Sequence, residues 1–199
     1  MVDHTDLEKR IRGYMSDYRY EHTLSVAAEC KRLAALFSVD EEKLVTAAYL
    51  HDITKEMPTD MQISLCREYG IALDESTLNS PKTLHSFSAP ALIMRDMPEL
   101  AHPDVITAVT YHTTGRANMG IYEKLLYLAD YIEPKRTFDD CIAVRELFNK
   151  NEGDPYKRLD DAILLSLKYT VSDLVSKGRY IHIETIKAYN WLLSAKPGE

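Results

Sequence analysis

The chain has 199 residues, of which 45% are hydrophobic and 28% are charged, so it can bury one good-sized core as a soluble globular protein does. Its formal net charge of −7 argues against a general nucleic-acid-binding protein, which normally presents a basic face. No apolar stretch approaches the roughly 20 residues that a membrane span needs, and the polar, acidic N-terminus does not read as a secretion signal. Cys30, Cys66 and Cys141 are odd in number and lack metal-site spacing, so we expect reduced thiols and a cytoplasmic protein.

Apolar residues recur at helical spacing along the first third of the chain. The capping box Thr5-Asp6-Leu7-Glu8 predicts a first helix over residues 5–18. A second helix is predicted over residues 20–37, with one apolar face made of Val26, Cys30, Leu33 and Phe37. Asp40 is the expected cap of a third helix, which ends at the pair His51-Asp52. Pro58 and Gly70 bound a fourth, over residues 59–69.

The rest of the chain also reads as helices joined by short connections. Residues 71–84 are irregular and polar, which predicts a loop. Helices are expected over residues 85–94, 103–112, 122–133, 139–150, 155–177 and 184–194, with Pro103 as a first helical residue. The tetrapeptide Tyr180-Ile181-His182-Ile183 is too short for more than an extended turn. The absence of repeats and linkers in the sequence predicts one all-α domain.

Six polar side chains interrupt these apolar faces: His22, His51, Asp52, His85, His112 and Asp130. A lone histidine on such a face is usually a core residue bonded to a backbone carbonyl. A buried, ionised carboxylate needs a cation or several donors, because its burial otherwise costs several kcal/mol. Histidine nitrogens and carboxylate oxygens together suit a divalent transition metal such as iron, manganese or zinc. The sequence therefore predicts that one metal ion gathers these residues.

The order of these residues resembles that of the HD superfamily of metal-dependent phosphohydrolases, and the surrounding residues resemble its bacterial YqeK family. The matching blocks run from residue 18 to residue 192: Tyr18-Arg19-Tyr20-Glu21-His22-Thr23, His51-Asp52-Ile53-Thr54-Lys55, Leu84-His85, Tyr111-His112-Thr113-Thr114-Gly115-Arg116, Tyr127-Leu128-Ala129-Asp130-Tyr131-Ile132-Glu133-Pro134-Lys135-Arg136 and Tyr189-Asn190-Trp191-Leu192. The resemblance implies a single compact HD domain over residues 1–199, with a core over about residues 18–136 and C-terminal helices over 139–194 packed on it. It also implies symmetrical hydrolysis of diadenosine tetraphosphate into two molecules of ADP.

The resemblance also implies roles for individual residues. It puts His22, His51, Asp52 and Asp130 on the metal and implies iron, with manganese, cobalt or zinc as alternatives. It makes Asp52, Lys55, His85 and His112 the catalytic candidates. Contacts to a dinucleoside polyphosphate substrate and an ADP- or GDP-type product would fall on Arg19, Asp52, Ile53, Thr54, Lys55, His85, His112, Thr113, Asp130, Arg136, Ile181, His182, Ile183, Glu184 and Thr185.

Two points stay open at the level of sequence. His85 and His112 could protonate a departing oxygen or hold a second ion, although Thr113 stands where many HD relatives have a second histidine. Arg19 and Lys55 lie three residues from His22 and Asp52, a spacing that would bring both cations to a phosphate chain, but plain surface solvation is the alternative.

Several other functions compete with this hypothesis. They are another HD nucleotide phosphohydrolase or phosphodiesterase, a non-catalytic metal- and nucleotide-binding regulator, an HD-fold di-iron oxygenase, and a helical interaction module. The 13 tyrosines also allow a homodimer.

Overall fold

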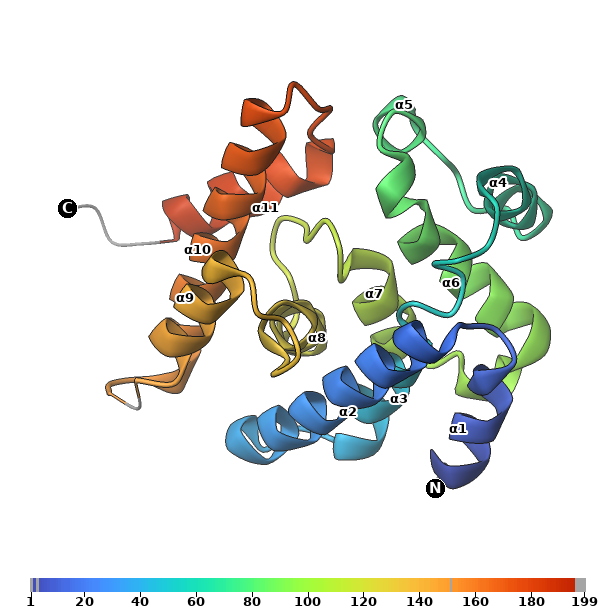
Figure 1. Cartoon of the computed structure of the whole chain (residues 1–199), viewed down its shortest axis with the longest axis horizontal. Helices are drawn as coiled ribbons and strands as arrows, with labels where there is room; N and C mark the ends of the chain where they lie inside the picture. The colour runs from blue at the N-terminus through green and yellow to red at the C-terminus, as the bar shows by residue number, and fades with distance from the viewer. Residues whose placement is uncertain (1, 3, 151, 196–199) are drawn as a thin grey trace.

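The computed structural model describes residues 2, 4–150 and 152–195 (Figure 1). Over these residues the chain forms eleven α-helices, two short 3-10 helices and no strand. The elements in chain order are α1 (His4–Arg12), α2 (Asp17–Phe37), α3 (Glu41–Leu50), α4 (Thr59–Glu68), α5 (Glu75–Leu78), η1 (Pro81–Thr83), α6 (Leu84–Asp96), η2 (Pro98–Leu100), α7 (Pro103–Tyr111), α8 (Ile121–Ile132), α9 (Asp139–Phe148), α10 (Pro155–Ser176) and α11 (Ile183–Ser194). The expected all-α fold is confirmed.

The centre of the fold is a group of packed helices that come from distant parts of the chain. Helix α2 packs on α3 and α8, and α7 packs on α3, α6 and α8. Helices α9, α10 and α11 lie together on one side of this group, with α10 against α8 (Figure 1). Helix α4 covers α6 on another side, and α1 packs on α3. The C-terminal ends of α3, α7 and α8 thus come within reach of one another.

Capping residues in the local sequence explain where α2 and α3 begin. The Ser16 hydroxyl accepts a hydrogen bond from the backbone N–H of Arg19 at 3.3 Å and caps α2. Asp40 caps α3 in the same way through the backbone N–H of Lys43, also at 3.3 Å, as predicted. The predicted apolar face of α2 is buried throughout: Val26, Cys30, Leu33 and Phe37.

Two segments differ from the sequence-based expectations. Helix α1 begins at His4 and ends at Arg12, so Thr5 lies inside the helix rather than at its cap, and residues 13–16 form a turn instead of continuing the helix to residue 18. The expected loop over residues 71–84 contains α5 and η1. Asp74 caps α5 by accepting from the backbone N–H of Thr77 at 2.7 Å. One turn of helix is too short to show a hydrophobic period, which explains why the pattern missed it.

Two further expectations concern membranes and thiols. Within the described part of the chain, no helix combines the length and the apolar character that crossing a bilayer requires. The three cysteines are free and buried. Burial raises the pKa of the thiols of Cys66 and Cys141 to about 11, so both thiols are inert and pack as small apolar groups.

Candidate metal centre

The fold brings the six predicted histidines and aspartates into one buried cluster. Asp52 lies in its middle, with its carboxylate oxygens 3.2 Å from His85 Nε2, 3.5 Å from His51 Nε2 and 3.6 Å from His112 Nε2. On the other side of the cluster, His22 Nε2 lies 3.0 Å from Asp130 Oδ1 and 3.9 Å from Asp52 Oδ2. Two ligand-like triads result, each with its atoms within 4.8 Å of one another: His22, His51 and Asp130, and His51, Asp52 and His112.

His51 and His112 each follow the last residue of a helix, and a backbone carbonyl of that helix orients each ring. His51 follows α3, whose last seven residues are all buried, so the helix carries it into the core. Its Nδ1 lies 2.6 Å from the carbonyl oxygen of Ala48, and the Nδ1 of His112 lies 2.7 Å from that of Val109. A carbonyl oxygen only accepts, so Nδ1 carries the proton in both rings. The Nε2 lone pair of each ring therefore points into the cluster, as a metal-ligating histidine requires.

His22 is oriented by a residue that the sequence analysis did not single out as functional. Its Nδ1 lies 3.2 Å from Oε1 of Glu133, a side chain that is only 2% exposed. The other oxygen, Oε2, accepts from the Ser25 hydroxyl at 2.5 Å and from the backbone N–H of Lys135 at 2.7 Å. A carboxylate behind a ligating histidine is a recurrent support in metal sites. The signal was present in the sequence, because Glu133 follows Asp130 by three residues, a spacing that shares one helix face.

Three buried polar atoms of the cluster make no well-directed hydrogen bond, although His22 Nε2 lies 3.0 Å from Asp130 Oδ1: Nε2 of His22, Nε2 of His51 and Oδ1 of Asp52. Each such atom costs on the order of 1–3 kcal/mol in a folded protein, so their convergence calls for a physical reason. Lone pairs on two imidazoles and a carboxylate that face the same space are the donor set of a divalent transition metal. The residues present therefore fit a divalent cation.

Basic side chains border the carboxylates of the cluster. Arg19 donates to Asp52 Oδ2 and Arg136 to Asp130 Oδ1, each at 2.5 Å. Burial raises the pKa of Asp52, but the neighbouring His51 and Lys55 outweigh it and hold that pKa well below its usual range. For Asp130 burial is again the largest influence, and Arg136 and His22 outweigh it, so its pKa is also lowered. Both carboxylates are therefore ionised, as metal ligands must be.

His85 and His112 lie at the other end of the cluster, next to Lys55 and Thr113. His85 Nε2 is 3.0 Å from Lys55 Nζ, 3.1 Å from His112 Nε2 and 3.1 Å from Thr113 Oγ1. Burial, followed by the charge of Lys55, lowers the pKa of His85 to about 3. Burial also lowers the pKa of His112. Both imidazoles are thus neutral, and His85 can accept a hydrogen bond from the Lys55 ammonium.

Some of the expected substrate contacts lie deeper than that role suggests. Ile53 and Thr54 are 1% and 0% exposed. The Thr54 hydroxyl donates to the backbone oxygen of His85 at 3.0 Å, so it supports the backbone that carries a cluster residue and does not face the substrate.

The expected 181–185 segment borders a pocket of about 420 Å³ through His182 and Thr185, and Thr113 lines the same pocket. Of the other segment residues, Ile183 is 43% exposed, and Glu184 pairs with Lys187 at 2.7 Å.

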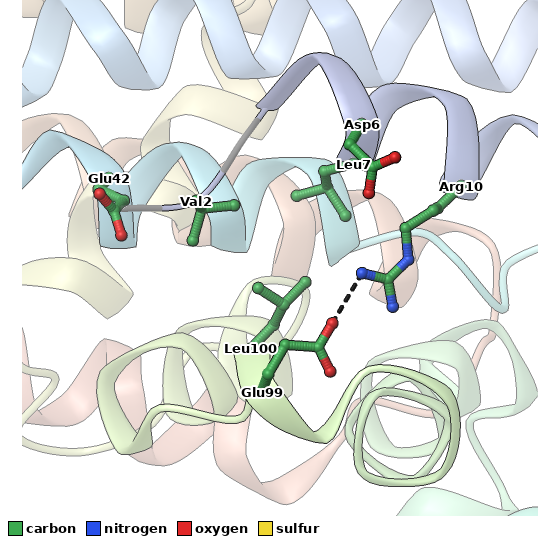
Figure 2. Close-up of a pocket in the computed structure, with 7 residues that line it drawn as sticks. All are labelled: Val2, Asp6, Leu7, Arg10, Glu42, Glu99 and Leu100. Carbon is green, nitrogen blue, oxygen red and sulfur yellow. Dashed lines mark hydrogen bonds and ion pairs between the residues drawn. The ribbon is translucent and has the colours of Figure 1, made fainter.

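Two further pockets differ in their relation to the cluster. One, of about 630 Å³, is lined by His22, Arg19, Lys55 and Arg136, so it opens directly onto the cluster. The other, of about 360 Å³, lies between α1 and the η2 segment and contains no residue of the cluster (Figure 2). The Arg10–Glu99 ion pair, at 2.7 Å, crosses it. We therefore assign no part of the chemistry to this last pocket.

An all-helical fold with a buried histidine–aspartate cluster defines a class, and comparisons with known proteins identify it. A family model described as "HD domain" matches residues 19–135. A symmetrical bis(5'-nucleosyl)-tetraphosphatase of Halalkalibacterium halodurans is 32% identical over 183 residues, covering 92% of this chain and 93% of the relative. One of Bacillus subtilis is 33% identical over 187 residues, covering 92% and 94%.

A solved structure agrees with these matches. It is a crystal structure of a predicted HD superfamily hydrolase involved in NAD metabolism from Clostridium acetobutylicum, 31% identical, with a TM-score of 0.88 over 98% of this chain and 100% of that one. The chain belongs to the HD domain family and, within it, groups with the symmetrical bis(5'-nucleosyl)-tetraphosphatases. The family resemblance that the sequence motifs carry is thereby confirmed.

Proposed function

We propose that the chain is a metal-dependent hydrolase that cleaves diadenosine tetraphosphate symmetrically and releases two molecules of ADP. The observation that carries the proposal is the buried cluster, in which three unpartnered ligand atoms converge beside three basic side chains. The relatives of matching length, named for the symmetrical cleavage of bis(5'-nucleosyl) tetraphosphates, support the same substrate class.

In this proposal His22, His51, Asp52 and Asp130 hold the metal, and we propose iron as the native ion, with manganese, cobalt or zinc as alternatives. A divalent cation bound there would polarise a phosphoryl oxygen and lower the pKa of water from near 16 to roughly 7. The protein supports this chemistry by keeping both carboxylates ionised and the Nε2 lone pair of His51 aimed into the cluster.

The phosphate chain would bind to Arg19, Lys55 and Arg136, three of the basic residues that line the pocket next to His22. Arg19 and Arg136 each contact a cluster carboxylate now, and their remaining N–H groups can bind two phosphate oxygens at once. Lys55 Nζ lies 3.7 Å from Asp52 and 3.0 Å from His85, so its ammonium is well placed to neutralise charge on the departing phosphate. His85 Nε2 accepts a hydrogen bond from the Lys55 ammonium and so holds it in that position.

One nucleoside would occupy the pocket that Thr113 shares with His182 and Thr185. Its wall includes Pro81, Leu174 and Tyr180, which offer apolar and aromatic surface to a base and a ribose. Thr113 connects this pocket to the cluster, because its hydroxyl lies 2.9 Å from His112 Nε2 and 3.1 Å from His85 Nε2.

The test is incubation of the purified protein with diadenosine tetraphosphate and added iron, manganese or cobalt, with products separated by chromatography. The proposal predicts ADP as the sole nucleotide product. AMP together with ATP would mean an asymmetric cut and would contradict the proposal. Tight ADP binding without hydrolysis would favour the alternative of a non-catalytic regulator.

A further inference from the structure

The pocket that opens onto His22 has more features than phosphate binding requires. It has a volume of about 630 Å³, and two aromatic side chains border it together with Arg19 and Arg136. Tyr18 comes from the first turn of α2, and Phe138 from the residue that precedes α9. Residues 120 positions apart in the sequence thus meet at one opening beside the cluster.

Both rings are exposed to an extent that packing does not explain. Tyr18 is 77% exposed and Phe138 is 69% exposed. Phe138 also occupies the N-cap position of α9, where a polar side chain normally accepts a backbone hydrogen bond, and it makes no such bond. The Arg19 guanidinium lies 5.8 Å from the centre of the Tyr18 ring. Neither ring serves the core or its helix, so the local choice of residue points to a ligand.

The symmetry of the proposed reaction indicates which ligand these rings would bind. A substrate cut between its second and third phosphates has two equal halves, which leave the cluster along different paths. The proposed function places one nucleoside beside Thr113. The second half of the phosphate chain can follow Arg19, Lys55 and Arg136 into the pocket that His22 lines. That path ends at Tyr18 and Phe138.

We propose that this pocket is the subsite for the second nucleoside, in which Tyr18 and Phe138 stack on the nucleobase. The proposal rests on the proposed function and deepens it. Stacking on aromatic rings tolerates any base, because every base has a π face. The subsite therefore favours dinucleoside polyphosphates over mononucleotides without selecting one base.

The experiment compares two substrates with the same phosphate chain: diadenosine tetraphosphate, with two nucleosides, and adenosine 5'-tetraphosphate, with one. With one water each, cleavage between the second and third phosphates gives two ADP from the first and ADP plus pyrophosphate from the second. Tyr18→Ala and Phe138→Ala should each raise KM for diadenosine tetraphosphate about tenfold, the order of one base–aromatic stack. KM for adenosine 5'-tetraphosphate should stay within twofold, because its one nucleoside can occupy the pocket beside Thr113.

Two controls separate stacking from damage to the fold. Tyr18→Phe keeps the ring and should retain the KM of the wild type. Tyr156→Ala removes a tyrosine on α10 that is 54% exposed and lines neither pocket, and it should change neither substrate's KM. Calorimetry with a dinucleotide whose central bridging oxygen is replaced by methylene should show the same tenfold loss for the alanine variants, without turnover.

The possible outcomes distinguish failure of the subsite from failure of the proposed function. An unchanged KM for diadenosine tetraphosphate in the double alanine variant, with a wild type that cleaves it, would overturn the subsite and leave the proposed function intact. Equal losses for both substrates would also overturn it, because the two rings would then act on the phosphates or the cluster. A wild type that cleaves neither substrate would overturn the proposed function and this inference with it.

Discussion

Replacing Glu133 by glutamine tests whether the protein orients His22 as a metal ligand. Glutamine keeps the size of the buried side chain but has one acceptor oxygen where glutamate has two. In the structure Oε1 faces His22 Nδ1, and Oε2 accepts from two donors, the Ser25 hydroxyl and the Lys135 backbone N–H. Whichever way the new amide turns, at least one of these buried or partly buried donors faces an NH2 group instead of an oxygen.

The expected magnitude follows from these contacts. A buried donor without an acceptor costs about 1–3 kcal/mol, so the metal-free variant should lose stability in that range. Loss of the carboxylate behind a ligating histidine typically lowers metal affinity by about 10–100-fold. That range corresponds to about 1.4–2.7 kcal/mol of binding free energy.

The assay measures the dissociation constant for manganese or cobalt by competition with a chromophoric chelator, and unfolding of the metal-free protein by circular dichroism. Glu146→Gln is the matched control, because Glu146 is exposed on α9 and the same change there should alter neither quantity. A folded Glu133→Gln protein with the wild-type metal affinity would refute the role of Glu133 behind His22.

Three other perturbations address the rest of the site. Asp52→Ala removes the central carboxylate, so we expect loss of both bound metal and turnover; full turnover with metal retained would refute the site. Lys55→Ala removes an ammonium 3.0 Å from His85 Nε2, so KM should rise while metal content, measured by atomic emission, stays unchanged. Loss of metal in that variant would instead make Lys55 a structural residue. Removal of the metal by a chelator, from a free concentration about 1,000 times the dissociation constant, should cost about 4 kcal/mol. A chain of this length should then melt about 10 °C lower, and an unchanged melting temperature would argue against a bound cation.

The helices that build the cluster were the most predictable part of the fold. Helix α2 has a long apolar period and α3 a capping aspartate, so both were located within a few residues of their observed bounds. The short α5 and the early end of α1 were missed, because a single turn has no period and the Gly13 turn follows a run of good helix formers. Local pattern therefore located long elements and failed on short ones.

The cluster itself was foreseeable from residue type, and its surroundings were not. A carboxylate in an apolar helix, as at Asp130, indicates a buried site because its burial needs compensation. The place where Tyr18 and Phe138 meet depends on how α2 and α9 are placed around α8, which no local pattern encodes. The homodimer that the tyrosines allow and the division into a core with appended helices stay predictions.

Metal binding at the histidine–aspartate cluster is tested most directly by anomalous diffraction from crystals grown with iron or manganese. We expect one strong anomalous peak among Nε2 of His22, Nε2 of His51 and the carboxylates of Asp52 and Asp130. Metal-loaded crystals with no peak at that position, or with the peak on other residues, would contradict it.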